Sequence, residues 1–166
     1  MRSRVFLSLG SNLGDKKENL ERACQEIKKY SIIEKVSRIY ETEPLHFTEQ
    51  DSFYNCGVQV LCDLDPITLL EKVKDTEKKM GRVDSIRYGP RIIDIDIIFW
   101  KKNGQYISMK SEDLVIPHPM WHKREFVIKT MNELNVGRLV NNYIEENNID
   151  LAKLNQEIIY VSDLNI

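Results

Sequence analysis

Two aspartates in an otherwise apolar segment are the first residues to suggest chemistry. Asp94 and Asp96 stand two apart in "RIIDIDIIFW". Because side chains alternate between the faces of a β-strand, both carboxylates are expected to point the same way, with Cα atoms roughly 6–7 Å apart. Ile92, Ile98 and Trp100 fall on the same predicted face, which would therefore be half-buried. Two carboxylates there repel each other and lose hydration unless a cation compensates.

A divalent cation is the natural partner for such a pair. Mg²⁺ prefers oxygen ligands and is often held by one or two carboxylates together with substrate phosphates and water. The alternative is an edge strand whose polar face carries aspartates, although Asp is a poor strand former. A second pair, Asp63 and Asp65 in "CDLDP", is interpreted as structural, because Asp65 precedes Pro66 as a helix cap and Asp63 suits a turn.

Several arginines lie near the aspartate strand. Arg82, Arg87 and Arg91 surround the turn "YGP", and Arg124 lies on a later predicted helix. The guanidinium fork matches two phosphate oxygens, whereas any single arginine is also compatible with an ordinary surface position. The polar stretch 81–90 suits a lid that closes over a ligand.

His118, between two prolines in "IPHP", is the next candidate, either for phosphate contact or as a structural residue. His122 follows at zinc-ligand spacing. The glutamate of the metalloprotease signature is absent and Pro119 interrupts the spacing, so zinc is not predicted.

Two further residues combine polarity with predicted burial. Asn55 follows Phe53 by two on one strand face, a pairing able to stack and hydrogen-bond a flat heterocycle, although Phe53 by itself is explained as core. Glu77 lies on or beside the buried stripe of a helix, where a last-turn carboxylate opposes the helix dipole. Its structural and functional interpretations are equally open.

Composition restricts the class of protein. The chain has 166 residues, 42% of them hydrophobic and 30% charged, with a net charge of −2. We expect a single domain, 1–166, without general affinity for nucleic acid or membrane. The three cysteines form no CxxC pair and predict small buried residues in a reducing compartment. With no apolar run long enough for a signal peptide or a membrane span, we expect a cytoplasmic protein.

Hydrophobic periodicity predicts the elements that must position these residues. Strands are expected at "RVFLSL", "SIIEKVSRIYET", "SFYNCGVQVLC", "RIIDIDIIFW" and, more briefly, "QYIS". Helices are expected after "GSNLGD", over "LDPITLLEKVKDTEKKMGR" and around "MWHKREFVIKTMNEL", and the remainder, from Asn135, is expected to begin as a helix. The order β-α-β-β-α-β is the ferredoxin-like pattern. We therefore predict an α+β fold, a ferredoxin-like βαββαβ core whose additional C-terminal helices complete a three-layer α/β/α sandwich.

Two long motifs carry a resemblance to a known family. "RYGPRIIDIDII" and "IPHPMWHKREFV" occur in order, within a similarity that runs from "LSLGSNLGD" to "REFVIKTMNEL". The chain thereby resembles the 6-hydroxymethyl-7,8-dihydropterin pyrophosphokinases of folate biosynthesis. The resemblance implies Mg²⁺-dependent transfer of pyrophosphate from ATP to the hydroxymethyl group of the pterin, releasing AMP. It implies ATP and 6-hydroxymethyl-7,8-dihydropterin as small-molecule partners, and we expect a monomer.

The resemblance also implies a role for individual residues. Two Mg²⁺ ions would be held by Asp94 and Asp96, which with Arg82 and Arg91 form the implied catalytic set. The implied pterin pocket comprises Thr42, Pro44, Leu45, Phe53, Asn55, Asp94, Arg124 and Phe126. The implied ATP side comprises Lys74, Glu77, Tyr88, Arg91, Ile97 and His118. Segments 45–51 and 82–89 would be the closing lids.

The chain departs from the usual family pattern mainly on the ATP side. Unusual residues there are Asp84, Lys74, Asp113 and Val115; Phe53 replaces a frequent tyrosine, and the tail after Asn135 matches little. Two other functions compete with the kinase: a two-metal phosphodiester hydrolase, which also suits paired aspartates with arginines, and a non-catalytic ferredoxin-like module that binds a small ligand.

Overall fold

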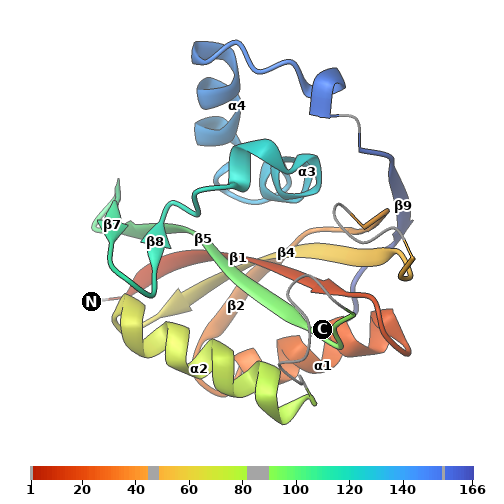
Figure 1. Cartoon of the computed structure of the whole chain (residues 1–166). Coiled ribbons are helices and arrows are strands. Elements are labelled where there is room, and N and C mark those ends of the chain that lie inside the picture. Colours follow the sequence, from red (N-terminus) through yellow and green to blue (C-terminus); the bar gives the residue numbers. More distant parts are fainter. Residues whose placement is uncertain (1, 45–48, 82–89, 155) are drawn as a thin grey trace.

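A computed structural model describes residues 2–44, 49–81, 90–154 and 156–166. Its centre is an antiparallel sheet in the order β6-β5-β1-β4-β3-β9, with β2 also pairing with β4 (Figure 1). The strands are β1 (Ser3–Ser11), β2 (Ile32–Val36), β3 (Ile39–Thr42), β4 (Phe53–Cys62), β5 (Asp94–Lys102), β6 (Gln105–Tyr106) and β9 (Ile158–Ser162).

Two helices cover the lower face of this sheet, and their caps follow from local sequence. In α1 (Lys16–Ile27), the Asp15 side chain accepts a hydrogen bond from the Glu18 N–H. In α2 (Pro66–Lys79), Asp65 accepts hydrogen bonds from two backbone N–H groups, as predicted for a helix cap. Beyond the end of α2, Gly81 adopts a φ of +97°, which favours glycine.

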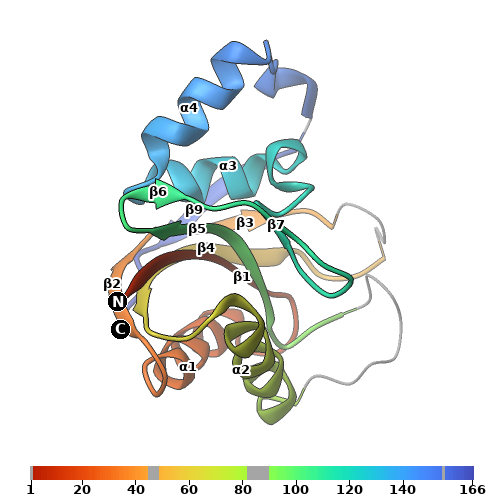
Figure 2. The same cartoon turned by 90° about the vertical axis from the view of Figure 1, so that its left-hand side faces the viewer.

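The helices α3 (Glu125–Asn132) and α4 (Gly137–Glu146) lie on the opposite side of the sheet (Figure 2). One buried cluster fills the space between the sheet and α1 and α2, and a second joins the sheet to the upper helices. Gly57 on β4 permits the close approach of α3, because a Cβ there would lie 3.0 Å from Met131 Cε. The α+β class and the three-layer sandwich around a ferredoxin-like core are confirmed.

Two predictions about the strands were wrong in detail. The predicted strand 31–42 is divided into β2 and β3, with Ser37 between them accepting a hydrogen bond from the Gly57 N–H. The register of β5 against β1 shifts between Phe6 and Leu7, which leaves one extra residue in β5. Ile98 therefore shares the upper face with the aspartates, but Trp100 packs into the lower cluster instead.

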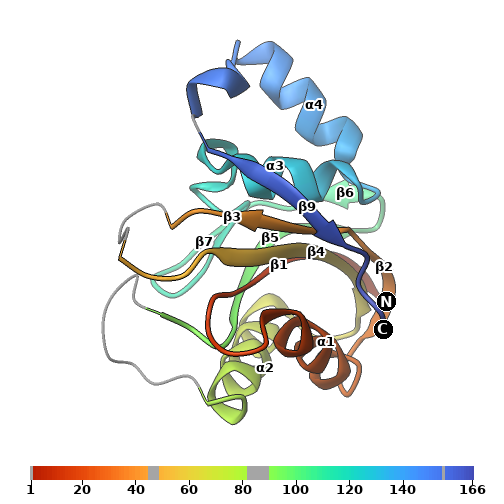
Figure 3. The same ribbon diagram turned by 90° about the vertical axis from the view of Figure 1, so that its right-hand side faces the viewer.

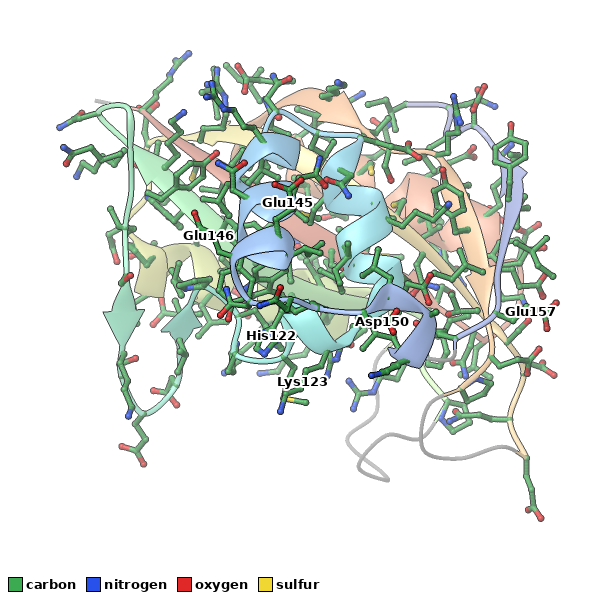
Figure 4. The ribbon with its side chains drawn as sticks, turned by 90° about the horizontal axis from the view of Figure 1, so that it is seen from above. His122, Lys123, Glu145, Glu146, Asp150 and Glu157 are labelled. Atoms are coloured by element: carbon green, nitrogen blue, oxygen red, sulfur yellow. The ribbon has the colours of Figure 1, made fainter. Side chains whose placement is uncertain are left out.

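The later part of the chain contains more short elements than the sequence indicated. The predicted loop before His118 contains a small hairpin, β7 (Met109–Lys110) with β8 (Val115–Ile116), and the following helix is divided into a 3₁₀ turn, Trp121–Lys123, and α3. Viewed from above, this turn, which carries His122 and Lys123, and α4 lie over the sheet (Figure 4).

The tail ends in a strand that the sequence did not predict. After a 3₁₀ turn at Leu151–Leu154, β9 pairs antiparallel with β3 at the edge of the sheet (Figure 3). Among the described residues, no helix combines the length and apolarity needed to cross a membrane.

Candidate active site

Strand β5 presents both aspartates on the upper face of the sheet. Asp94 lies opposite Gly10 and Asp96 opposite Ser8 on β1. Their side chains remain 30% and 32% exposed, so each carboxylate is accessible to a ligand. The alternation that the sequence predicted is therefore present at these two positions.

Each aspartate contacts a guanidinium group from a different part of the chain. Arg91 Nη1 donates to Asp94 Oδ1 at 2.8 Å, and Arg124 Nη1 lies 3.5 Å from Asp96 Oδ2. Arg91 lies three residues before the start of β5, whereas Arg124 is the N-cap residue of α3. In the pair of Arg124 and Asp96, the upper helical layer therefore contributes the guanidinium group and the sheet contributes the carboxylate.

A first cavity opens beside the aspartates, over β1, β3 and β4. Its floor includes the small residues Ser8 and Gly10, and Phe53 and Phe126 contribute aromatic walls. A Cβ at Gly10 would lie 3.3 Å from Asn55 Oδ1 and 3.6 Å from Phe53 Cδ1. The absence of a side chain at Gly10 therefore leaves space in the floor of the cavity beside Asn55 and Phe53. The full lining is Ser8, Gly10, Thr42, Glu43, Gln50, Phe53, Asn55, Arg91, Asp94, Asp96, Arg124, Phe126 and Gln156.

Asn55 is held rigidly within this first cavity. Its Nδ2 donates to Thr42 Oγ1 at 2.8 Å and to the Tyr40 carbonyl oxygen at 3.3 Å, and the residue is 3% exposed. With the amide nitrogen bonded to protein oxygens, Oδ1 lies on the side of Gly10. Asn55 can therefore offer an acceptor to the N–H groups of a ligand.

A second cavity lies on the other side of the aspartates, between α2, β5 and the β7–β8 hairpin. The Glu77 carboxylate borders it, 4% exposed, and Oε1 accepts a hydrogen bond of 2.8 Å from the Ile95 N–H, between the two aspartates. The full lining is Leu70, Val73, Lys74, Glu77, Arg91, Asp94, Ile95, Asp96, Ile97, Glu112, Asp113, Leu114, Val115, His118, Pro119 and Arg124.

His118 enters the second cavity as a neutral donor. Burial, followed by the nearby Arg124 charge, lowers the pKa of His118 to about 4, while Asp94 opposes the shift. Its Nδ1 accepts a hydrogen bond from the Met120 N–H at 3.1 Å. The proton of the neutral ring is therefore on Nε2, which is available to donate to an anionic ligand.

The two cavities meet at the carboxylate pair. Arg91, Asp94, Asp96 and Arg124 line both of them. A molecule in either cavity can therefore reach the same two carboxylates and the same two guanidinium groups. This arrangement suits a reaction in which a charged group passes between two bound molecules.

Asn12 connects the segments around this junction. Its Oδ1 accepts from the Arg91 N–H at 2.7 Å, while Nδ2 donates to Gln50 Oε1 at 3.0 Å and to the Asp51 carbonyl oxygen at 3.2 Å. Asn12 is 1% exposed. The turn after β1 thereby fixes the backbone of Arg91.

The structure brings most of the predicted site residues together. Thr42, Phe53, Asn55, Asp94, Arg124 and Phe126 line the first cavity, and Lys74, Glu77, Arg91, Ile97 and His118 line the second. Pro44 is buried but belongs to neither lining. Leu45, Arg82 and Tyr88, with most of the two expected lids and Asp84, lie outside the described residues.

Sequence reasoning missed several lining residues. Ser8 and Gly10 belong to the predicted first strand and its turn. Their small side chains could have indicated that this strand leaves space for a ligand. Glu43 and Gln50 flank the long connection before β4. Gln156 comes from the tail, whose sequence gives no indication of where it packs.

Comparison with known proteins gives this arrangement a family. Residues 6–136 match the family described as "7,8-dihydro-6-hydroxymethylpterin-pyrophosphokinase (HPPK)". The "2-amino-4-hydroxy-6-hydroxymethyldihydropteridine pyrophosphokinase" of Bacillus subtilis is 33% identical over 136 residues, which cover 81% of this chain and 79% of that protein.

Longer proteins contain the same unit. The "Folic acid synthesis protein FOL1" of Dictyostelium discoideum is 45% identical over 130 residues, 78% of this chain but only 19% of that protein. A Plasmodium falciparum HPPK-DHPS structure, solved with STZ-DHP, matches with a TM-score of 0.66 and 20% identity over 97% of this chain and 49% of that one, which supports the fold alone. From the match over residues 6–136 and the similarity to the Bacillus protein, this chain belongs to the 7,8-dihydro-6-hydroxymethylpterin-pyrophosphokinase family.

Proposed function

We propose that residues 1–166 form one catalytic domain that transfers the pyrophosphoryl group of ATP to the hydroxymethyl oxygen of 6-hydroxymethyl-7,8-dihydropterin, releasing AMP. The observation that carries this proposal is the wall of Arg91, Asp94, Asp96 and Arg124, which borders both cavities. A transfer between two substrates needs such a junction, because catalysis of phosphoryl transfer rests on positioning and charge neutralisation.

The first cavity is the proposed pterin site. Phe53 and Phe126 offer apolar ring surfaces to a flat heterocycle, and Asn55 Oδ1 offers an acceptor to its N–H groups. Thr42, 2% exposed, holds the Asn55 amide in this orientation. A reduced pterin fits this combination because its rings are flat and its edge carries several hydrogen-bonding groups. The implied contacts of Pro44 and Leu45 belong to the same proposal.

The second cavity is the proposed ATP site. Lys74 and the Nε2 of neutral His118 are donors for phosphate oxygens, with Arg91 and Arg124 at the junction. Ile97 contributes an apolar surface beside the buried Glu77 carboxylate. Arg82 and Tyr88 complete this proposal from the sequence. The junction is where the triphosphate would meet the pterin.

The carboxylate pair has the chemistry of a Mg²⁺ site. Asp94 and Asp96 are hard oxygen donors on one strand face, both partly exposed at the junction. Among the described residues, no group of three or more His, Cys, Asp or Glu side chains converges to hold a metal. Two carboxylates match the usual Mg²⁺ site, in which phosphate oxygens and water complete the coordination. When bound, Mg²⁺ ions supply charge neutralisation on the attacking and leaving oxygens.

The residues of the chain position the reacting groups. The hydroxymethyl oxygen of the pterin forms a bond to the β-phosphorus of ATP as the bond between that phosphorus and the α–β bridging oxygen breaks. The hydroxyl proton passes to a carboxylate of the Asp94–Asp96 pair, and AMP departs with the bridging oxygen. Arg91, 22% exposed, and Arg124, 23% exposed, can neutralise the charge on the transferred group because both are partly shielded from water.

Measurement of AMP tests the proposal. The protein is incubated with ATP and 6-hydroxymethyl-7,8-dihydropterin, with Mg²⁺ or with EDTA, and AMP is quantified by chromatography. We expect AMP only when both substrates and Mg²⁺ are present. No AMP at saturating substrate would remove the proposal, and hydrolysis of a generic phosphodiester without pterin would favour the hydrolase instead.

A further inference from the structure

The C-terminal segment places a polar side chain in the first cavity. Gln156 lines this cavity together with Thr42, Glu43 and Phe126. It lies beyond residue 136, where the match to the family ends. Because Ile158 of β9 pairs with Thr42 at the end of β3, the residue two positions earlier lies just beyond that strand end (Figure 3). The position of Gln156 therefore depends on the docking of β9.

Helix α3 sets the orientation of the Gln156 amide. Gln156 Oε1 accepts a hydrogen bond from the Phe126 N–H at 3.4 Å. Phe126 lies in the first turn of α3, where backbone N–H groups lack intrahelical acceptors, and the N-cap residue Arg124 gives no side-chain cap. Rotating the amide by 180° would bring its NH₂ group against this N–H. The carbonyl oxygen of Gln156 therefore faces the helix.

The other end of the amide is left buried without a partner. Gln156 Nε2 is inaccessible to water and finds no hydrogen-bond acceptor among the residues that the structure describes. Such buried donors are rare in native proteins, because desolvation is then not compensated. Here the donor belongs to a residue that lines a cavity, so a small shift of the amide on ligand binding would bring Nε2 to an acceptor on the bound molecule.

We propose that Gln156 is a substrate-contacting residue whose Nε2 donates a hydrogen bond to an acceptor on the pterin ring. This inference rests on the function proposed above, because it takes the first cavity to be the pterin site. Asn55 and Gln156 line the same cavity, and their amides are oriented oppositely by the protein: Asn55 Nδ2 and Gln156 Oε1 are the ends that bond to protein atoms. A pterin carries ring N–H and amino donors as well as carbonyl and imine acceptors, so two amides of opposite polarity select this heterocycle.

Local geometry separates Gln156 from its neighbour. Glu157 is exposed and lies at the outer edge of the molecule, where the chain enters β9 (Figure 4). Gln156 is half-buried and reaches the cavity. A change of charge at Gln156 consequently alters the cavity itself, whereas charges at Glu157 already face solvent.

Gln156→Glu separates substrate contact from helix capping. The glutamate keeps an oxygen to accept from the Phe126 N–H, but it replaces the Nε2 donor with a second acceptor. We expect the KM for the pterin, and its Kd measured by fluorescence titration with 6-hydroxymethylpterin, to rise about tenfold. The KM for ATP should be unchanged and the Tm should not fall. Gln156→Leu loses both interactions, so the pterin Kd should rise and the Tm should also fall.

Gln105→Glu is the matched control. Gln105 is exposed on β6, at the opposite edge of the sheet from β9. Its variant carries the same charge change and should bind the pterin like the wild type. An equal loss of affinity in Gln105→Glu would identify a general charge effect and overturn the inference.

The two proposals fail in different ways. If the wild type binds the pterin and forms AMP while Gln156→Glu binds equally well, Gln156 is only a helix cap and this inference alone is wrong. If the wild type neither binds the pterin nor forms AMP, the proposed function is wrong and the inference with it.

Discussion

The two cavities share the same carboxylates but are built differently. Strands of the central sheet supply most of the floor of the first cavity, and Asn55 is held there by two hydrogen bonds. The second cavity is bordered instead by α2 and the β7–β8 hairpin, whose turn carries the exposed Glu112 and Asp113. Strand register positions the first site, whereas connecting segments form much of the second.

The two cavities also differ in how far their lining residues depart from the usual family pattern. Asp113 and Val115 occupy positions where the family resemblance implies arginine and threonine, and both line the second cavity, the proposed ATP site. In the first cavity, the proposed pterin site, Phe53 replaces a frequent tyrosine and retains an aromatic ring. We infer that pterin recognition is the more constrained of the two and that ATP affinity is the more adjustable.

The largest expected effect comes from the junction, whose residues border both cavities, so that a substitution there should impair the reaction as a whole. Asp96→Ala should reduce kcat by about 10²–10³-fold, because it removes a charge that acts on the transferred group. AMP formation measures turnover, and circular dichroism and Tm check that the fold is retained. Asp150→Asn, exposed on the upper side of the molecule, is the control. Near-normal turnover of Asp96→Ala would contradict the metal-binding role.

Asn55→Ala should affect the pterin side alone. It removes the acceptor that faces the cavity and leaves Thr42 Oγ1 without its donor. The KM for the pterin should rise about tenfold or more, whereas the KM for ATP should not change. Steady-state kinetics with each substrate varied in turn gives both values. Asn142→Ala, exposed on α4, should match the wild type; an equal rise in both KM values for Asn55→Ala would refute separate sites.

Asp113→Asn should affect the ATP side alone, and in the favourable direction. Removing this exposed negative charge from the cavity reduces repulsion of the triphosphate, so the KM for ATP should fall about twofold to fivefold. The gain should shrink at high salt, because exposed charges are screened. Kinetics at low and high NaCl measures both effects. An unchanged KM for ATP would place Asp113 outside the influence of the nucleotide.

The smallest effect concerns the protonation of His118. Its pKa of about 4 in the folded protein lies below the ordinary value of 6.5, so the folded state binds fewer protons than the unfolded state between these values. Stability from this group is complete above pH 6.5 and declines as the pH falls toward 4. Tm measurements from pH 7 to 4 should show a smaller decline for His118→Asn than for the wild type. A His118 NMR signal titrating near pH 6.5 in the free protein would contradict this.

Features encoded by neighbouring residues were predictable from the sequence. Asp65 followed by Pro66 located the start of α2, and the two-residue spacing of Asp94 and Asp96 placed both carboxylates on one face. These signals depend only on capping and on strand periodicity. The order of elements then sufficed for the α+β class and the ferredoxin-like core.

Features that depend on packing between distant segments were not predictable. Arg124 reaches Asp96 only because α3 packs closely over Gly57. The position of Gln156 requires β9 to pair with the edge strand β3, and nothing in the tail sequence specifies that partner. Asn12 likewise acquires its role through residues 38 to 79 positions away along the chain.

The extra residue in β5 divides this strand into two halves with independent orientation. Before the register shift, Asp94 and Asp96 face the upper layer; after it, Trp100 faces the lower one. In a regular strand of the same sequence, side chains would alternate without interruption, and Trp100 would share the face of Asp94 and Asp96. The Trp100 indole would then leave the lower core, in which it is buried. One unpaired residue thus lets a single strand serve as a platform for chemistry at one end and as an anchor for the opposite core at the other.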